Sequence, residues 1–423
     1  MNLLEKDQLY IWHPFTQSGI EDISIPITSG EGAILFDEEG NKYIDAISSW
    51  WVNLHGHAHP YIADKINQQL RTLEHVIFAG FTHAPAILLA ERLLQHTPKN
   101  QVKVFYSDNG STSIEVGLKM ALQYYYNIGD PRTCVVALKN SYHGDTFGAM
   151  SVGARDSFNV AFEPLLFNVQ FIDAPTKDLA EQSFLQLKMI AKKYKIAAFI
   201  YEPLLQGSGG MLMHDIEGLH QLIKFCKEEN IICVADEVLT GFGRTGKFFA
   251  SENMSTAPDI MCLSKGLTGG TMALGVTTCT KEIFDAFVSQ DKSKTFYHGH
   301  SYTANPLACT AGLASLDLLE KEECWIQIKA IENMHLNFAT RLSQYKNVEQ
   351  VRILGTIIAF DLRTDERSGY FNSISTYLKR EFLKKQIILR PLGNTVYILP
   401  PYCITQLQLE KVYDTIIEVI KEL

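Results

Sequence analysis

The feature that most constrains the fold is a regular alternation of short apolar segments with amphipathic helical segments along the middle of the 423-residue chain. Apolar runs occupy residues 103–108, 134–139, 197–203, 231–238, 259–264 and 275–280. Helical spacing of apolar residues appears between some of them, as in 113–126 and 217–230. This pattern predicts an α/β domain with a mostly parallel sheet and helices on both faces.

The two ends of the chain follow a different pattern. Residues 33–45 predict a β-hairpin around a Glu-Gly-Asn turn, residues 351–362 predict one strand, and residues 387–401 predict a second hairpin. A helix is expected to start near residue 304, and Thr405 with Gln408 forms a capping box for a closing helix. We therefore expect a large central domain over 53–310 and a small α+β domain built from 1–52 and 311–423.

Composition and charge exclude several classes of protein. Acidic residues outnumber basic ones, 47 to 38, and both signs are interspersed, so there is no basic face for nucleic acid or an anionic membrane. No apolar run approaches a membrane span, and charged residues at positions 5–7 break any signal-peptide core. The eight cysteines are scattered without a C-x-x-C pair, which favours small buried side chains over disulfides or zinc ligands. These features predict a cytoplasmic chain.

Two charged residues stand at the ends of apolar runs. Lys265 follows the run 259–264, where burial would lower the pKa of its amine and make it nucleophilic; the alternative is a surface lysine on a loop. Asp236 ends the run 231–235, and the alternative there is a turn or helix-capping aspartate. Because ligands bind at the carboxyl ends of parallel strands, the two side chains are candidates for a convergent acid–amine pair.

A third candidate is the segment 107–115. Gly110 would let backbone amides approach an anion, and Ser111 could cap the following helix and donate its hydroxyl, which together suit a phosphate group. The alternative is an ordinary capped turn between a strand and a helix.

Two patterns are misleading. Residues 241–247 fit the phosphate-loop pattern G-x-x-x-x-G-K, but Phe248 replaces the Ser or Thr that would bind Mg²⁺, and the segment is too rich in glycine to open a helix. Histidines cluster at 55–59 and 298–300, where the alternation with glycine favours structural loops, so no metal site is predicted.

The paired motifs DEVLTGFGRTGKFFA and SKGLTGG resemble the class III aminotransferases, pyridoxal-phosphate enzymes of fold type I. The blocks IWHPFT, SSWWVNLHGHAHP, YHGDTFGAMSV and RPLGNTVYILPPY resemble the branch of this family that acts in biotin biosynthesis. The resemblance covers essentially the whole chain. It implies a homodimeric enzyme that transaminates 8-amino-7-oxononanoate to 7,8-diaminononanoate, with S-adenosylmethionine as the amino donor.

The resemblance also implies residue roles for pyridoxal phosphate. Lys265 would attach the cofactor covalently, Asp236 would pair with its pyridine nitrogen, and Tyr142 would stack on its ring. Gly110 and Ser111 would hold the phosphate together with Ser301 from the partner subunit.

Substrate roles follow from the same resemblance. Arg390 would bind a substrate carboxylate, and Arg244 and Glu202 would be supporting charges. The remaining substrate-binding candidates are Phe15, Trp50, Trp51, Asp145 and Gly299.

Three positions depart from the family's pattern. Phe15 stands where many members carry a tyrosine, His300 where relatives often have proline, and Leu392 where some have phenylalanine. Because some relatives use lysine as the donor, Phe15 leaves lysine open as an alternative to S-adenosylmethionine. Two rival hypotheses remain. One is a class III aminotransferase with a different substrate, and the other is a non-catalytic protein that binds a nucleotide through residues 241–247.

Overall fold

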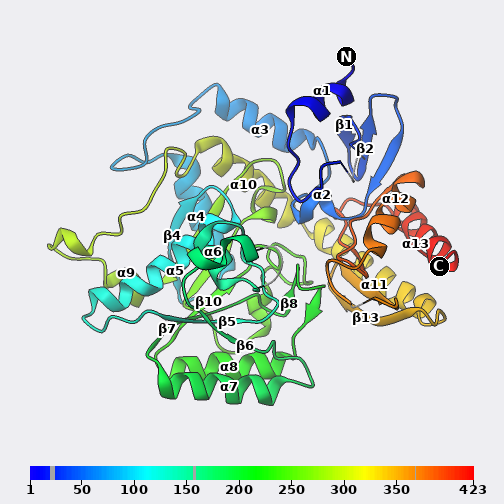
Figure 1. Cartoon of the computed structure of the whole chain (residues 1–423). Helices are drawn as coiled ribbons and strands as arrows, with labels where there is room; N and C mark the ends of the chain where they lie inside the picture. Colours follow the sequence, from blue (N-terminus) through cyan, green and yellow to red (C-terminus); the bar gives the residue numbers. More distant parts are fainter. Residues whose placement is uncertain (20–23, 156–158, 367) are drawn as a thin grey trace.

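The computed structural model describes residues 1–19, 24–155, 159–366 and 368–423, and its centre is a seven-stranded sheet (Figure 1). The strand order is β4-β12-β11-β10-β7-β5-β6. The bounds are β4 Gln101–Ser107, β5 Cys134–Leu138, β6 Gln170–Ile172, β7 Ile196–Tyr201, β10 Ile232–Asp236, β11 Ile260–Leu263 and β12 Gly275–Thr280. Strand β12 is antiparallel to both neighbours and the other pairs are parallel, which confirms the predicted mostly parallel sheet.

The inner strands β5, β7, β10, β11 and β12 are buried on both faces, whereas the edge strand β4 has exposed residues. Successive side chains of a strand point to opposite faces of the sheet. Val135 and Ala137 pack in the core under helix α5 (Gly110–Asn127), whereas Val136 and Leu138 pack in the core on the other face. Helices α7 (Ala180–Lys193) and α8 (Ile216–Glu228) contribute to that second core and lie along the lower edge of Figure 1. Both faces of the sheet are therefore covered, as the apolar runs predict.

Further helices complete the central part of the chain. Helix α10 packs against α3 and α4 and begins at Pro306, two residues after the expected start near residue 304. The bounds are α3 Pro60–Leu70, α4 Ala84–His96, α6 Phe147–Val152, α9 Lys281–Asp285, α10 Pro306–Leu319 and α11 Glu322–Leu342.

Both ends of the chain meet in a second region, on the right of Figure 1. One sheet has the order β1-β2-β3-β15 and so joins N-terminal strands to a C-terminal one; a second has the order β13-β14-β16. The helix predicted after the capping box of Thr405 and Gln408 is α13, and that box is present. The bounds are α1 Leu3–Tyr10, β1 Ile27–Glu31, β2 Ile34–Asp37, β3 Lys42–Asp45, α2 Ser48–Trp51, β13 Val348–Leu354, β14 Ile357–Leu362, α12 Ile374–Lys384, β15 Ile387–Ile388, β16 Thr395–Ile398 and α13 Gln406–Lys421. The predicted boundaries at residues 53 and 310 remain predictions.

The predicted hairpin over 33–45 is confirmed by the antiparallel pair β2 and β3, but two C-terminal predictions are wrong. Residues 351–362 form two paired strands, β13 and β14, because the chain reverses at Gly355, which has a positive φ of 56°. Residues 387–401 do not form a hairpin: β15 pairs with β3, and β16 pairs with β14. Pro391 lacks an amide hydrogen, and a single bridge between Leu392 and Thr395 is the local pairing that the structure shows between these segments.

Among the described residues, no helix combines the length and the apolar character that a membrane crossing requires. The eight cysteines are free thiols, and five of them are buried: Cys226, Cys233, Cys262, Cys279 and Cys309. This burial agrees with the prediction that they act as small apolar side chains.

Candidate active site

A cavity of about 240 Å³ lies at the carboxyl edge of the seven-stranded sheet. Segments that follow five strands reach it: Gly110 after β4, Tyr142 after β5, Glu202 after β7, Asp236 at the end of β10 and Lys265 after β11. Because these strands run in the same direction, residues far apart in the sequence converge at one edge. Trp51 and Ser111 also line the cavity, so it brings together every predicted cofactor residue except Ser301.

Lys265 presents its amine to this cavity. Its Nζ lies 4.4 Å from the centroid of the Trp51 ring, and its backbone has a positive φ of 43° at the turn that ends β11. Burial lowers the pKa of Lys265 to about 8, and the nearby carboxylates of Asp236 and Glu202 partly oppose that shift. An amine with this pKa is largely available as a neutral nucleophile at mildly alkaline pH.

Asp236 is buried, and its carboxylate has two hydrogen-bond donors. His143 Nδ1 lies 2.7 Å from Oδ2, and the backbone N–H of Val238 donates to Oδ1 at 3.0 Å. His143 is also buried, so the pair is shielded from water. The sequence interpretation missed His143, although it adjoins Tyr142 in the YHGD block that carried the resemblance.

The N-terminus of α5 forms the anion-binding end of the cavity. The side chain of Asn109 caps the helix by accepting from the N–H of Thr112 at 3.0 Å, so the prediction that Ser111 is the cap is wrong. Ser111 lies two residues after the cap and lines the cavity, and its Oγ accepts from the N–H of Asp145 at 3.2 Å. The N–H groups of Gly110 and Ser111 are not used by the Asn109 cap, and first-turn amides such as these have no acceptor within the helix, so they suit a phosphate.

Gly144 makes this arrangement possible. Its φ is +127°, and a Cβ at this position would lie 2.0 Å from Ser111 Oγ. The segment that carries Tyr142 can therefore approach α5 only because residue 144 has no side chain.

Glu202 supports the segment of the cavity wall that carries Tyr142. Its carboxylate accepts from the N–H groups of Tyr142 at 3.2 Å and Gly207 at 2.9 Å. Burial raises the pKa of Glu202 to about 7, with the neighbouring charge of Asp236 adding to the shift. The phenol of Tyr142 donates to Asp145 Oδ2 at 3.0 Å, which fixes the orientation of the ring.

Arg244 is buried and binds carbonyl groups from both ends of the chain. It donates to the carbonyls of Pro400 at 2.9 Å, Trp51 at 3.3 Å and Asn53 at 3.2 Å. The segment 241–247, which fits the phosphate-loop pattern, thus forms turns that support the backbone of Trp51.

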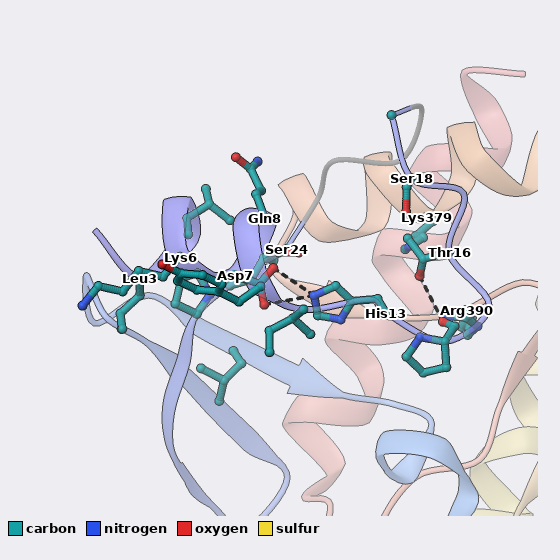
Figure 2. Close-up of a pocket in the computed structure, with 18 of the residues that line it drawn as sticks. Leu3, Lys6, Asp7, Gln8, His13, Thr16, Ser18, Ser24, Lys379 and Arg390 are labelled. Carbon is teal, nitrogen blue, oxygen red and sulfur yellow. Dashed lines mark hydrogen bonds and ion pairs between the residues drawn. The ribbon is translucent and has the colours of Figure 1, made fainter. Parts of the chain in front are cut away.

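A second, larger cavity of about 960 Å³ lies beside the N-terminal segment (Figure 2). Trp50 and Arg390 line it, and Figure 2 shows Arg390 near Thr16, while Asp7 and His13 pair elsewhere in its wall. The ring of Phe15 packs edge-on against Trp50 at 5.6 Å between centroids. The Arg390 guanidinium lies 4.8 Å from the Trp50 ring and donates to the Phe15 carbonyl at 3.1 Å. Three predicted substrate residues therefore form one cluster.

The paired tryptophans face different environments. Trp51 is buried and donates through Nε1 to the Tyr397 hydroxyl at 2.9 Å, whereas Trp50 is 39% exposed. The two neighbouring side chains therefore have different surroundings.

Gly299 and Ser301 lie in an exposed segment and line neither cavity of their own chain. His300 between them accepts at Nδ1 from the N–H of Tyr302 at 3.1 Å. In the other histidine cluster, His57 pairs with Asp45 at 2.9 Å and His55 with Ser315 at 3.0 Å. These contacts account for both histidines as parts of a folded loop.

The residues of the smaller cavity fit pyridoxal phosphate. The amine with a lowered pKa would bind the aldehyde carbon of the cofactor, and the buried carboxylate would pair with its pyridine nitrogen. The aromatic ring would pack on the cofactor ring, and the helix N-terminus would bind the phosphate. Gly110 and Ser111, in the first turn of α5, both line this cavity, so a phosphate bound beside them would lie at the helix N-terminus.

Comparison with known proteins agrees with this fit. Residues 15–420 match the family model of class III aminotransferases. The chain is 46% identical to the adenosylmethionine-8-amino-7-oxononanoate aminotransferase of Synechococcus elongatus, with 98% of this chain and 99% of the relative covered. A crystal structure of the enzyme of the same name from Methanocaldococcus jannaschii superposes with a TM-score of 0.95 at 38% identity, covering 99% of this chain and 98% of the other. An amine transaminase from an uncultivated Pseudomonas species, solved with pyridoxal phosphate bound, gives a TM-score of 0.90 at 30% identity and covers 98% of each chain.

Proposed function

The chain belongs to the class III aminotransferases, which depend on pyridoxal phosphate, and from this premise we propose that it converts 8-amino-7-oxononanoate to 7,8-diaminononanoate in biotin biosynthesis. The observation that carries the proposal is the Lys265 amine beside the buried Asp236 carboxylate, in a chain similar over nearly its full length to enzymes named for this reaction. The test is to assay 7,8-diaminononanoate formation against transamination of ornithine, β-alanine and γ-aminobutyrate. Preference for one of the latter three would refute the proposed substrate.

Cofactor binding uses the smaller cavity. Lys265 would attach pyridoxal phosphate, Tyr142 would pack on its ring, and the α5 N-terminus with Gly110 and Ser111 would hold its phosphate. The bound cofactor supplies an electron sink for the negative charge that develops on the carbon next to the amino nitrogen.

The protein's own groups manage charge and protons. Asp236 provides a buried negative charge for the pyridine nitrogen, and His143 keeps that carboxylate oriented by donating from Nδ1. When the amino group of the substrate has displaced Lys265, Lys265 Nζ is free to act as a base. It would accept the proton from the amino-bearing carbon of the substrate and return it to the cofactor carbon that Lys265 had occupied. Its pKa of about 8 suits both transfers near neutral pH.

Substrate binding extends toward the second cavity. The amino-ketone has an aliphatic chain that suits the aromatic surface of Trp50 and Phe15, and a carboxylate that suits the Arg390 guanidinium. Asp145, held beside Tyr142 by a hydrogen bond to its phenol, would face the amino end of the substrate.

The amino donor is proposed to be S-adenosylmethionine, with lysine as the alternative. Phe15 keeps an aromatic ring but lacks the hydroxyl of a tyrosine, and one neutral hydrogen bond contributes about 0.5–1.5 kcal/mol, or roughly a tenfold change at most. That loss alone is too small to exclude S-adenosylmethionine. The deciding measurement is the single-turnover rate at which each donor bleaches the cofactor's absorption band, and a faster rate with lysine would overturn the proposed donor.

A cytoplasmic homodimer is the proposed form of the enzyme. Ser301 and Gly299 are exposed and line neither of the two cavities described above, which supports a role for them in the active site of the partner subunit. Sedimentation at low concentration tests this assembly, since an active monomer would contradict it.

A further inference from the structure

The loop at residues 207–211 forms part of the cofactor cavity although it carries no predicted site residue. It joins the short antiparallel strands β8 (Leu205–Gln206) and β9 (Leu212–Met213), and Ser208 lines the cavity. A Cβ on Gly207 would lie 2.4 Å from the Leu239 side chain and 3.3 Å from the Trp51 ring. The N–H of Gly207 donates to Glu202, so a shift of this loop would disturb the wall that carries Tyr142.

Arg352 holds the far side of this loop. From strand β13 its Nε donates to the Met211 carbonyl at 2.9 Å, and its Nη2 donates to the Gly210 carbonyl. Gly210 and Met211 have positive φ values of 89° and 51°, so their carbonyls belong to a turn rather than to the β8–β9 ladder. The planar guanidinium has donors spaced to reach both carbonyls at once.

Other residues fix the guanidinium itself. Asp361 on β14 accepts from Nη2 at 2.8 Å, the Gln350 carbonyl accepts from Nη1 at 2.7 Å, and Thr395 on β16 donates to the same Asp361 oxygen at 2.7 Å. The β13–β14 register shifts between Glu349 and Arg352, and Gln350 has a positive φ of 49°. Such a bulge re-aims the side chains that follow it, and the Arg352 side chain is only 13% exposed.

We propose that Arg352, fixed by Asp361, is a positioning residue for the aminotransferase reaction: it couples the β13–β14–β16 sheet to the 207–211 loop and thereby to Glu202 and the cofactor cavity. This inference rests on the proposed function. It assigns to the C-terminal sheet a role in the geometry of the active site, exerted through two backbone carbonyls and without contact to substrate.

The test compares Arg352→Lys, Arg352→Met and Asp361→Asn in the holoenzyme. Lysine keeps the charge but cannot reach both carbonyls and Asp361 together, so we expect kcat/KM for 8-amino-7-oxononanoate to fall about tenfold or more, with a larger loss for methionine. The matched control is Arg363→Met, which breaks the exposed ion pair between Arg363, one residue after β14, and Glu349 on β13. Neither residue contacts the 207–211 loop through a hydrogen bond that the structure shows. This control should keep the wild-type kcat/KM.

Three further readouts separate positioning from simple stabilisation. A loosened Gly207 N–H would stabilise the charged form of Glu202 less, so the pKa of Glu202 would rise. Because charged Glu202 accepts from the N–H of Tyr142 at 3.2 Å, its protonation would weaken the support of Tyr142, and the acidic limb of the kcat profile would move to higher pH. The affinity for pyridoxal phosphate, measured by absorbance titration, should also fall. The melting temperature reports whether each variant is folded.

Unchanged kcat/KM, pH profile and cofactor affinity in folded Arg352→Lys, with only a lower melting temperature, would overturn the proposal. Failure of the proposed function looks different: the wild-type enzyme would then form no 7,8-diaminononanoate. In that case the cofactor affinities of the Arg352 variants and of the Arg363→Met control still decide the positioning role, because they do not depend on the substrate.

Discussion

Replacing His143 should impair turnover through its hydrogen bond to Asp236, and the size of the effect can be worked out from the geometry. Asp236 has two donors in the described structure, His143 Nδ1 at 2.7 Å and the Val238 N–H at 3.0 Å, and both acid and histidine are buried. Substitution of His143 by Leu removes the shorter of the two bonds. A hydrogen bond to a charged group contributes about 1.5–3 kcal/mol, and about 1.4 kcal/mol corresponds to a tenfold change in rate. We therefore expect kcat to fall by roughly 10- to 100-fold.

The control is His143→Asn, because the asparagine amide can donate from nearly the same position as Nδ1. It should retain most of the activity. Steady-state kcat is measured for wild type and both variants, together with the melting temperature and the cofactor content of each protein. A folded, cofactor-loaded His143→Leu enzyme within about threefold of wild type would refute the reasoning, since a bond of this class is worth more than that. Equal impairment of the two variants would refute it as well, because the lost donor would then not be the cause.

The remaining predictions concern the other groups of the site. Asp236→Asn should retain bound cofactor and lose several orders of magnitude in kcat, because an amide cannot balance the charge of the pyridine nitrogen; a mild loss would rule out that role. The rate at which the apoenzyme takes up pyridoxal phosphate should rise with pH, with a midpoint at about 8, the pKa of Lys265, because only the neutral amine attacks. A midpoint near the ordinary pKa of lysine would contradict the effect of burial on this amine. Lys265→Ala subunits mixed with Ser301→Ala subunits should regain some activity if Ser301 serves the partner's site, and no recovery would count against a shared site.

The central sheet was predictable because parallel strands buried on both faces appear as short apolar runs between helical segments. Val135 and Val136 face opposite cores, so both positions must be apolar. The C-terminal region was harder to predict, because there an apolar run continues across a turn and does not mark where one strand ends. The turn at Gly355 has apolar residues on both sides, which hides the break between β13 and β14.

Strand pairing in the C-terminal region depends on residues far away in the sequence. Ile387 pairs with Ile44, and Val396 pairs with Phe360, so β15 and β16 belong to different sheets despite their closeness in the chain. A turn signal such as that at Gly393 predicts a reversal but not which strand will receive each segment.

In the site, the residues at strand ends could be predicted and the residues that support them could not. Lys265 and Asp236 stand out because each follows an apolar run. His143 and Arg352 have no such signal, since their importance comes from hydrogen bonds to residues 93 and 141 positions away. The cap of α5 did have a local signal: Asn109 is a favoured N-cap residue, and Thr112 completes a reciprocal pair with it.

The phosphate-loop pattern at residues 241–247 illustrates how one segment can satisfy a motif and do different work. A buried guanidinium is costly unless its donors are bonded, and Arg244 bonds to carbonyls of Trp51, Asn53 and Pro400 while its guanidinium lies 5.1 Å from the Tyr402 ring. These acceptors come from both ends of the chain, and Trp51 is the residue whose ring lies 4.4 Å from Lys265 Nζ. The glycine at 243, with a φ of 95° and the Tyr402 hydroxyl 3.0 Å from where a Cβ would sit, permits that close packing. Gly243 therefore serves the close packing of this segment against the Tyr402 side chain. Arg244 beside it holds the backbone of Trp51, whose ring lies next to the reactive amine.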